Sequence, residues 1–209
     1  MKKMLYIFLI SIIFISCSKK ENEPEDFLKV NELMEKAEQI NEDFKSAEDK
    51  FEARKAAGDT LAIEWMKLYE LIPDVDGFTR SEPKGMMFSM ENLAYSNATA
   101  TFQKDNLEIE VSLYDYNQVV SLFAAATAWK NVGFNVEDEN GYQKVSQLKE
   151  ITDSWIFEEW RKNNKRATVT ISLNDRFFLQ VSANDQPGTE FVKSIAMKVI
   201  NKGKSIFNK

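Results

Sequence analysis

The chain has 209 residues, with 27 lysines and arginines, 33 aspartates and glutamates, and no histidine. Its formal net charge of −6 excludes the dense cationic face that nucleic-acid binding needs. Without histidine and with a single cysteine, it cannot build a Ser-His-Asp or Cys-His catalytic site or an imidazole-bound zinc site. The 12% aromatic content supplies enough apolar area for one ordinary domain core.

The first 17 residues have the order of a secretion signal. Two lysines precede an apolar run at 5–15, which is too short to span a bilayer, and the sequence FISC ends the segment at Cys17. This ending resembles the lipobox of bacterial lipoproteins, in which the cysteine is acylated and becomes the first residue of the mature chain. The resemblance implies a signal peptide at 1–16 and lipidation of Cys17 with palmitate. Ser18 after the cysteine, by resemblance to the usual sorting rule of such lipoproteins, implies attachment to the outer membrane of a Gram-negative-type bacterium. It leaves open whether the protein faces the periplasm or the cell surface.

Removal of the signal peptide takes two of the 27 basic residues, so 25 basic residues remain against 33 acidic ones and the net charge becomes −8. A chain of this charge attaches to a membrane through acyl chains rather than through anionic lipid. Because the lipid consumes Cys17, no disulfide is expected. Residues 17–26 are charged, contain Pro24 and lack apolar periodicity, so they are expected to form a lipidated tether.

Residues 27–73 are expected to form a helical neck, either one long helix or a helical hairpin. Gly58 and Asp59 interrupt the pattern, and a second helix is predicted over Thr60–Leu71 and ended by Pro73. The first helix carries apolar residues at steps of three and four, which are Val30, Leu33, Ala37, Ile40, Phe44, Ala47 and Phe51. This stripe either packs on the protein's own domain, which would leave a monomer, or pairs with a second helix as a coiled-coil dimer. We favour packing on the domain.

Residues 74–209 are expected to form the α+β domain. A connector is predicted at 74–85, and from Ala98 the apolar period changes from 3.6 to 2. Strands are predicted at 98–102, 107–113, 142–148, 155–160, 167–173 and 177–183. Two helices are predicted, one capped by Asn117 and closed by Gly133, and one capped by Thr189 that ends near Asn201 with Gly203 beyond it.

The two predicted hairpins also resemble each other in sequence. Ala98 corresponds to Ala167 at a spacing of 69, and after one inserted residue Val111 corresponds to Val181 at a spacing of 70. Each half reads strand, turn, strand, loop, helix, which indicates an internal ββα repeat. The predicted fold class is therefore α+β, a two-layer antiparallel sheet with two covering helices. In element order it looks like the small αβα domains of photosystem-associated and nuclear-transport accessory proteins, a likeness that implies no function.

Trp155, Phe157 and Trp160 are the candidate binding surface. Exposed, they could stack on a sugar ring or on an aromatic side chain of a partner; inside a strand, they would fill the core, which we favour. Glu158 and Glu159 are adjacent in a predicted strand and point to opposite faces, so they cannot flank one glycosidic bond. No catalytic residue and no cofactor is predicted. No metal ligand is predicted either, because the acidic loops at 74–77 and 137–141 do not complete a calcium-binding spacing.

These observations predict a lipid-anchored envelope protein with a non-catalytic binding or scaffolding role. A protein of the same envelope is the expected partner, and nucleic acid is excluded. The alternative is a carboxylate-based hydrolase acting on polysaccharide or cell wall. It needs two carboxylates roughly 5 to 9 Å apart in a cleft.

Overall fold

The computed structural model describes residues 25–90, 93–131 and 135–208. The signal peptide, Cys17, the tether residues up to 24 and Gly133 lie outside the described residues. By internal contacts the chain divides into 1–35 and 36–209, and the second unit is described below. The helices are α1 (Glu25–Ala56), α2 (Trp65–Leu71), α3 (Val120–Ala126), the 3₁₀ helix η1 (Ala128–Asn131) and α4 (Glu190–Phe207). The strands are β1 (Thr79–Arg80), β2 (Lys84–Met90), β3 (Leu93–Lys104), β4 (Leu107–Asp115), β5 (Asn135–Asp138), β6 (Gly141–Leu148), β7 (Ser154–Arg161), β8 (Arg166–Leu173) and β9 (Phe177–Ala183).

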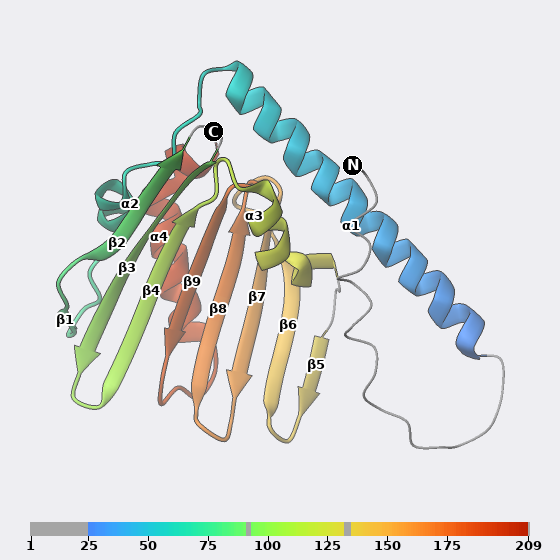
Figure 1. Ribbon diagram of the computed structural model, residues 1–209. Coiled ribbons are helices and arrows are strands. Elements are labelled where there is room, and N and C mark those ends of the chain that lie inside the picture. Colours follow the sequence, from blue (N-terminus) through green and yellow to red (C-terminus); the bar gives the residue numbers. More distant parts are fainter. Residues whose placement is uncertain (1–24, 91–92, 132–134, 209) are drawn as a thin grey trace. The chain divides into compact units, whose positions relative to one another are not determined.

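The described strands form one antiparallel sheet of nine strands, which confirms the predicted α+β class. Its order is β1-β3-β4-β9-β8-β7-β6-β5, and β2 pairs with β3 beside β1. One face carries the alternating apolar side chains of the central strands, such as Val111, Val169 and Val181, all fully buried. Helix α4, with buried residues such as Val192 and Ile200, covers this core face and lies behind the sheet in Figure 1. Helix α2 contributes Leu68 to the same core.

The strands with strict apolar alternation were predicted well. The hairpin around Lys104-Asp105-Asn106 is present, because β3 pairs with β4 from Lys104–Leu107 onward. Asp105 has a φ of 53°, a left-handed conformation that aspartate tolerates in tight turns. Strands β6, β7, β8 and β9 match their predicted ranges to within one residue at each end. Strand β3 begins five residues earlier than predicted, and both β3 and β4 end two residues later.

The connector predicted at 74–85 is wrong in its second half. Strand β1 and the beginning of β2 lie there, and β2 continues to Met90. The helix predicted from Thr60 begins five residues later, at Trp65. The reason is tertiary, because the Ile63 N–H donates to Asp115 Oδ2 (2.8 Å) and the Ser96 hydroxyl donates to the Ile63 carbonyl (2.5 Å). These bonds hold the segment before α2 extended, although its sequence favours a helix.

The helix predicted after Asn117 is also shorter than expected, and Asn117 does not cap it. Its N-cap position is Val119, which makes no side-chain capping bond, and the helix stops at Ala126 before η1 begins. Phe123 contacts Tyr116 (6.1 Å between ring centroids) and Trp129 contacts Phe157 (5.6 Å), so α3 and η1 pack on the face opposite α4. Figure 1 shows α3 in front of the sheet. Of the two predicted covering helices, α4 therefore covers the core face and α3 does not.

Helix α4 does not end near Asn201 but continues through Gly203 to Phe207. Gly203 is buried, and a Cβ atom there would lie 2.3 Å from the Phe207 ring. The glycine therefore gives the Phe207 ring room against the helix and does not terminate it. Thr189 occupies the N-cap position as predicted, but its hydroxyl makes no capping bond and donates instead to Glu158 Oε2 (2.6 Å).

Candidate functional site

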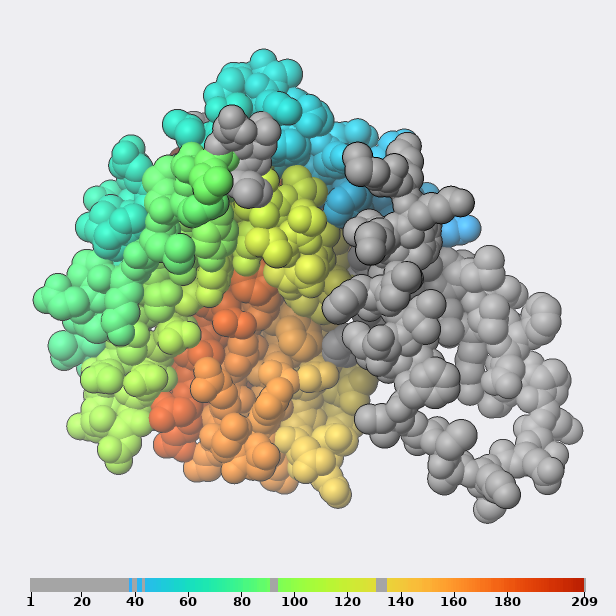
Figure 2. Space-filling model, viewed as in Figure 1, coloured from blue at the N-terminus to red at the C-terminus, as the bar shows by residue number. Residues whose placement is uncertain are grey.

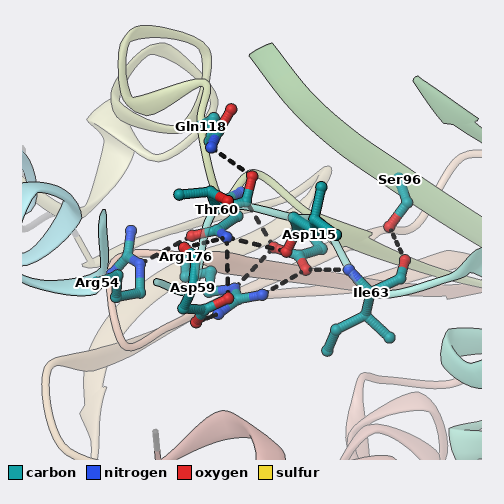
Figure 3. Close-up of polar contacts among 10 residues, drawn as sticks. Arg54, Asp59, Thr60, Ile63, Ser96, Asp115, Gln118 and Arg176 are labelled. Atoms are coloured by element: carbon teal, nitrogen blue, oxygen red, sulfur yellow. Dashed lines mark hydrogen bonds and ion pairs between the residues drawn. The ribbon is translucent and has the colours of Figure 1, made fainter. Parts of the chain in front are cut away.

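Two features of the described residues are candidates for a functional site. The first is an arginine cluster at the end of the sheet, formed by Arg176, Asp115, Asp59, Asn117 and Arg54 (Figure 3). The second is the sheet face opposite α4, called the open face below. The cluster joins the C-terminal end of α1 to the sheet, and the open face presents aromatic and hydroxyl side chains.

The end of α1 explains how Asp59 and Arg54 reach the sheet. Gly58 has a φ of 80°, and the Asp59 N–H donates to the Arg54 carbonyl (2.9 Å) while the Gly58 N–H donates to the Lys55 carbonyl (3.0 Å). This pair of bonds is a Schellman motif, which needs a left-handed residue that glycine adopts without strain. It reverses the chain immediately after α1, so that Asp59 points to the end of β4 and the start of β9.

Arg176 is the centre of the cluster. Its Nε and Nη2 donate to the two oxygens of Asp115, each at 2.8 Å, and its Nη1 donates to Asp59 Oδ2 (2.6 Å). Burial alone would lower the pKa of Arg176, but the bonds and charges of Asp115 and Asp59 raise it above the usual value. The Asp115 side chain is fully buried, so the bidentate pair is the compensation for its desolvation.

Asn117 joins the segment after α1 to the cluster. Its amide nitrogen donates to the carbonyls of Asp59 (3.1 Å) and Leu61 (3.0 Å), and its amide oxygen accepts from Arg54 Nε (2.9 Å). Gln118 donates in the same way to the Thr60 carbonyl, as Figure 3 shows. Burial, with the charge of Arg176 next in effect, lowers the pKa of Arg54. Apart from Arg54 Nη2, which is buried without a hydrogen-bond partner, the polar groups of the cluster bond to one another, and a set of this kind serves to fix the structure.

One turn earlier on α1, Lys50 bonds to Asp175 (2.8 Å) and to Asp153 (2.5 Å). Burial opposes the charge of Lys50, but these two carboxylates raise its pKa above the usual value. Lys130 approaches Asp175 from η1 at 3.3 Å. The two ion pairs of Lys50 therefore attach α1 to the turns before β7 and β9. Asp175 and Arg176 lie between the strands predicted at 167–173 and 177–183, where the local expectation is only a turn.

The open face is organised by rows that cross the strands. Because antiparallel partners lie side by side, the register places in one row Asn97, Tyr114, Phe178, Ser172 and Trp155. The next row contains Thr99, Ser112, Gln180, Thr170 and Phe157. Figure 2 looks onto this face, where atoms of β3, β4, β9 and β8 are visible between the loops. Helices α2 and α4 pack on the other side of these strands.

Aromatic rings gather where β3, β4 and β9 meet. Tyr114 contacts Phe178 (5.6 Å between ring centroids), Tyr95 (6.4 Å) and Tyr116 (6.0 Å). Burial and the neighbouring tyrosines raise the pKa of Tyr95 and of Tyr116. The four rings are half-buried, so each keeps part of its surface available to a second molecule.

Hydroxyl and amide groups continue the face. Thr99 and Ser112 share a hydrogen bond (3.0 Å), and the Gln180 amide donates to the Thr170 hydroxyl (3.5 Å). Ser172, between Phe178 and Trp155 in its row, is buried, and its Oγ has no hydrogen-bond partner. A buried hydroxyl without a partner is unfavourable, and an incoming acceptor would remove that cost.

The three predicted binding residues are divided between the two faces of β7. Trp155 and Phe157 lie half-buried on the open face, and Phe157 contacts Trp129 of η1. Trp160 lies on the core face, where it packs against the core and its ring N–H donates to the Gln186 carbonyl (2.8 Å). The favoured core position therefore applies to Trp160, whereas Trp155 and Phe157 belong to the open face.

Glu158 and Glu159 also point to opposite faces, as expected. Glu158 accepts from Lys193 (2.7 Å) and from Thr189 (2.6 Å) at the start of α4. Glu159 accepts from Gln143 (2.6 Å) and from Arg161 (3.1 Å). Both carboxylates are therefore engaged by donors of the protein itself.

Among the cavities at the surface of the described domain, four have two carboxylates each in their lining. The pairs are Asp138 and Glu159, Glu150 and Asp153, Asp59 and Glu64, and Glu108 and Glu110. In the first three pairs one carboxylate is engaged in an ion pair: Glu159 with Arg161, Asp153 with Lys50, and Asp59 with Arg176. In the fourth pair, Glu108 accepts a hydrogen bond from Gln103 (3.4 Å). Within the described residues, no cluster of three or more acidic or cysteine side chains is arranged to hold a metal ion.

No protein-family model matches the chain, and no curated protein matches it. Among solved structures it is similar to an uncharacterised protein from Mycobacterium smegmatis, with a TM-score of 0.35 and 10% sequence identity over 66% of this chain and 96% of that one. This likeness assigns neither a family nor a function. In the part of the chain that the structure describes, no helix is long and apolar enough to cross a membrane.

Proposed function

We propose that this is a lipid-anchored envelope protein that binds a ligand or partner on the open face without catalysing a reaction. The observation that carries the proposal is the double row of aromatic and hydroxyl side chains across β3, β4, β9, β8 and β7, on the side opposite α4. Rings with an exposed surface stack on flat apolar groups such as the face of a sugar ring or an aromatic side chain. The neighbouring hydroxyls and amides supply directional bonds.

A photo-reactive benzoylphenylalanine at position 155 or 180 of the full chain tests the binding surface in living cells. Both positions lie on the open face, and the same substitution at Lys202, an exposed residue of α4, is the matched control. We expect an adduct at positions 155 and 180 that is absent at 202. A carbohydrate adduct would identify a glycan, and a protein adduct an envelope partner. Equal labelling at all three positions, or none, would refute the open face as the binding surface.

The hydrolase alternative lacks a specific supporting observation. Each carboxylate pair described above contains a member that already bonds to a donor of the protein. A hydrolase instead needs one protonated and one ionised carboxyl group free to reach the glycosidic bond. Incubation of the protein with purified cell-wall sacculi distinguishes the two functions. Release of reducing ends would establish the hydrolase and reject a purely binding role.

The anchor is proposed from the sequence FISC, with acylation of Cys17 and attachment to the outer membrane. Metabolic labelling with palmitate tests it, and we expect label on the wild-type chain and none on Cys17→Ala. Density fractionation of the two membranes tests the location. Label that persists in Cys17→Ala would reject the anchor, and recovery in the inner membrane would reject the outer-membrane location.

We further propose that the helical neck packs on its own domain and that the two hairpins are copies of one unit. The buried side chain of Ala47 and the ion pairs of Lys50 support the first proposal. The register between β4 and β9 supports the second, because Val111 lies directly opposite Val181, its counterpart in the repeat. A twofold axis through this pair would superpose the hairpins. The different lengths of α3 and α4 limit the likeness to the strands.

A further inference from the structure

Strand β2 is exposed along its whole length, a property that it shares, among the described strands, with the short edge strand β5. All seven of its residues are exposed, and it pairs only with β3 within the described residues. Met86, Met87, Phe88 and Met90 are between 38% and 61% exposed. By the register with β3, Met86, Phe88 and Met90 lie on the open face, and Met87 lies on the face that α2 covers. An apolar strand at the edge of a sheet is therefore presented to solvent on both of its faces.

The backbone of β2 also has unused hydrogen-bonding groups. The Met86 N–H points toward β3, where it donates to the Asn97 side chain (3.2 Å). Because the peptide groups of alternate residues in a strand point to opposite sides, Gly85, Met87 and Ser89 direct their N–H and C=O groups away from β3. Three residues of the free edge are thus ready to pair with another strand.

Natural sheets normally protect such an edge with charged residues, proline or a bulge. Strand β2 has one charged residue, Lys84 at its beginning, and no proline. Specific interfaces begin at roughly 1,000 Å² in total, so each copy would have to contribute roughly 500 Å². The seven exposed residues of β2 are the surface available for this. Leu61, which is also exposed and lines a cavity together with Met87, enlarges the apolar patch.

We propose that β2 is the contact surface for a second copy of this chain, paired antiparallel with Met87 opposite Met87 of the second copy. This register is symmetric, as a twofold dimer requires. It pairs Gly85 with Ser89 of the second copy and uses all the outward groups of both strands. It places Lys84 opposite Met90, so that no two like charges face each other. The result is a continuous sheet across two copies.

The α2 side of the interface supports the choice of Met87 as its centre. Met87 and Leu61 line a cavity of about 580 Å³ that also contacts Phe177 and Ile206. Residues opposite each other in a hydrogen-bonded antiparallel pair have Cα atoms about 5.5 Å apart and side chains on the same face. Met87 of the second copy therefore reaches the mouth of this cavity. The monomer expected from the sequence depends only on the helical stripe, because no alternation in the sequence of β2 marks it as a strand.

Cysteine cross-linking of the full chain in membranes tests the register. A Cα separation of about 5.5 Å lies within the range that a disulfide bridges, so Met87→Cys is expected to form a covalent dimer under mild oxidation. Ser89→Cys is the matched control, because its two copies would lie about 14 Å apart at the strand rise of roughly 3.4 Å per residue. Met86→Cys and Phe88→Cys are expected to cross-link with each other when co-expressed. The wild-type chain measures any background from Cys17.

The mass of the detergent-solubilised full chain by light scattering is the second measurement. We expect a dimer for the wild type and a monomer for Met87→Glu, in which two carboxylates meet at the twofold axis, and a melting temperature of this variant that no longer depends on protein concentration. A monomeric wild type, or equal cross-linking of Met87→Cys and Ser89→Cys, would overturn the proposal. So would a Met87→Cys adduct with a different protein, which would make β2 a docking site for that partner.

Discussion

Arg176 and Asp115 form a bidentate ion pair between the start of β9 and the end of β4, with both bonds at 2.8 Å. The carboxylate of Asp115 is fully buried and also accepts from the backbone N–H groups of Ile63 (2.8 Å) and Asn117 (3.0 Å). One ion pair therefore determines where the chain between α1 and α2 lies on the sheet. Buried pairs of this kind contribute more to a unique structure than to net stability.

Arg176→Ala is expected to lower the free energy of unfolding by about 3–5 kcal/mol, because it leaves the buried carboxylate of Asp115 without a counter-charge. Urea unfolding followed by tryptophan fluorescence measures the change. Arg161→Ala is the control, since its ion pair with Glu159 is formed by a well-exposed arginine and is worth less than about 1 kcal/mol. Similar losses in both variants would show that the Arg176 pair is not specially important.

The tyrosines of the open face predict an alkaline loss of stability. Because burial raises the pKa of Tyr95 and Tyr116 in the folded state, their contribution is complete below the ordinary value of 10.0 and is lost as the pH rises through the folded values. Tyr95→Phe should therefore lose less stability than the wild type between neutral pH and pH values above 10.0. Thermal melts across this range, with an ultraviolet titration of tyrosine, measure it. Parallel curves for the two proteins would contradict the prediction.

The strands were predictable where burial is one-sided. From Leu107 to Val111 the more buried and the exposed residues alternate in the structure as in the sequence, because one face of β4 packs on the core. Strand β2 has the sequence KGMMFSM and is exposed on both faces, so no alternation marks it. Its pairing with β3 depends on a neighbour that the local sequence does not specify.

The arginine cluster could not be predicted, because it joins three distant positions. Asp59, Asp115 and Arg176 are separated by 56 and 61 residues, and each has an ordinary local role as a helix-end, strand-end or turn residue. The role of Asn117 could not be predicted for the same reason, because its partners are distant in the sequence. Its residue type suits a helix cap, but Asp59, Leu61 and Arg54 occupy its side chain and the helix begins three residues later. The hydroxyl of Thr189 is likewise used by Glu158.

Gly203→Ala is expected to destabilise the domain, although alanine is the better helix former by about 1 kcal/mol. The new Cβ would lie 2.3 and 2.6 Å from two atoms of the Phe207 ring. That ring is fully buried and packs at 5.1 Å from Phe177, so it has little room to move. Overpacking of this kind costs about 1–3 kcal/mol. Thermal unfolding measures the change, with the exposed Lys202→Ala as the neutral control, and a stabilised Gly203→Ala would mean that the ring is free to shift.

Ala47 and Phe44 provide a matched pair for testing how α1 is attached to the domain. Both belong to the apolar stripe of the sequence, but Ala47 is 2% exposed and Phe44 is 40% exposed. Ala47→Glu would place a carboxylate in a buried position without a counter-charge, and a group so placed costs about 2 kcal/mol or more. Phe44→Glu leaves its carboxylate in contact with solvent and should have a much smaller effect.

The expected result for Ala47→Glu is release of the end of α1, since detachment avoids the burial of charge and the sheet keeps its own core. Trypsin should then cleave faster after Lys50 and Arg54, which the native ion pairs and hydrogen bonds hold on the domain. Phe44→Glu should be cleaved at the wild-type rate. Limited proteolysis with mass spectrometry distinguishes these outcomes. If the two variants are cleaved equally, or if Phe44→Glu is the more sensitive, the stripe has a different buried side and the helix is not held through Ala47.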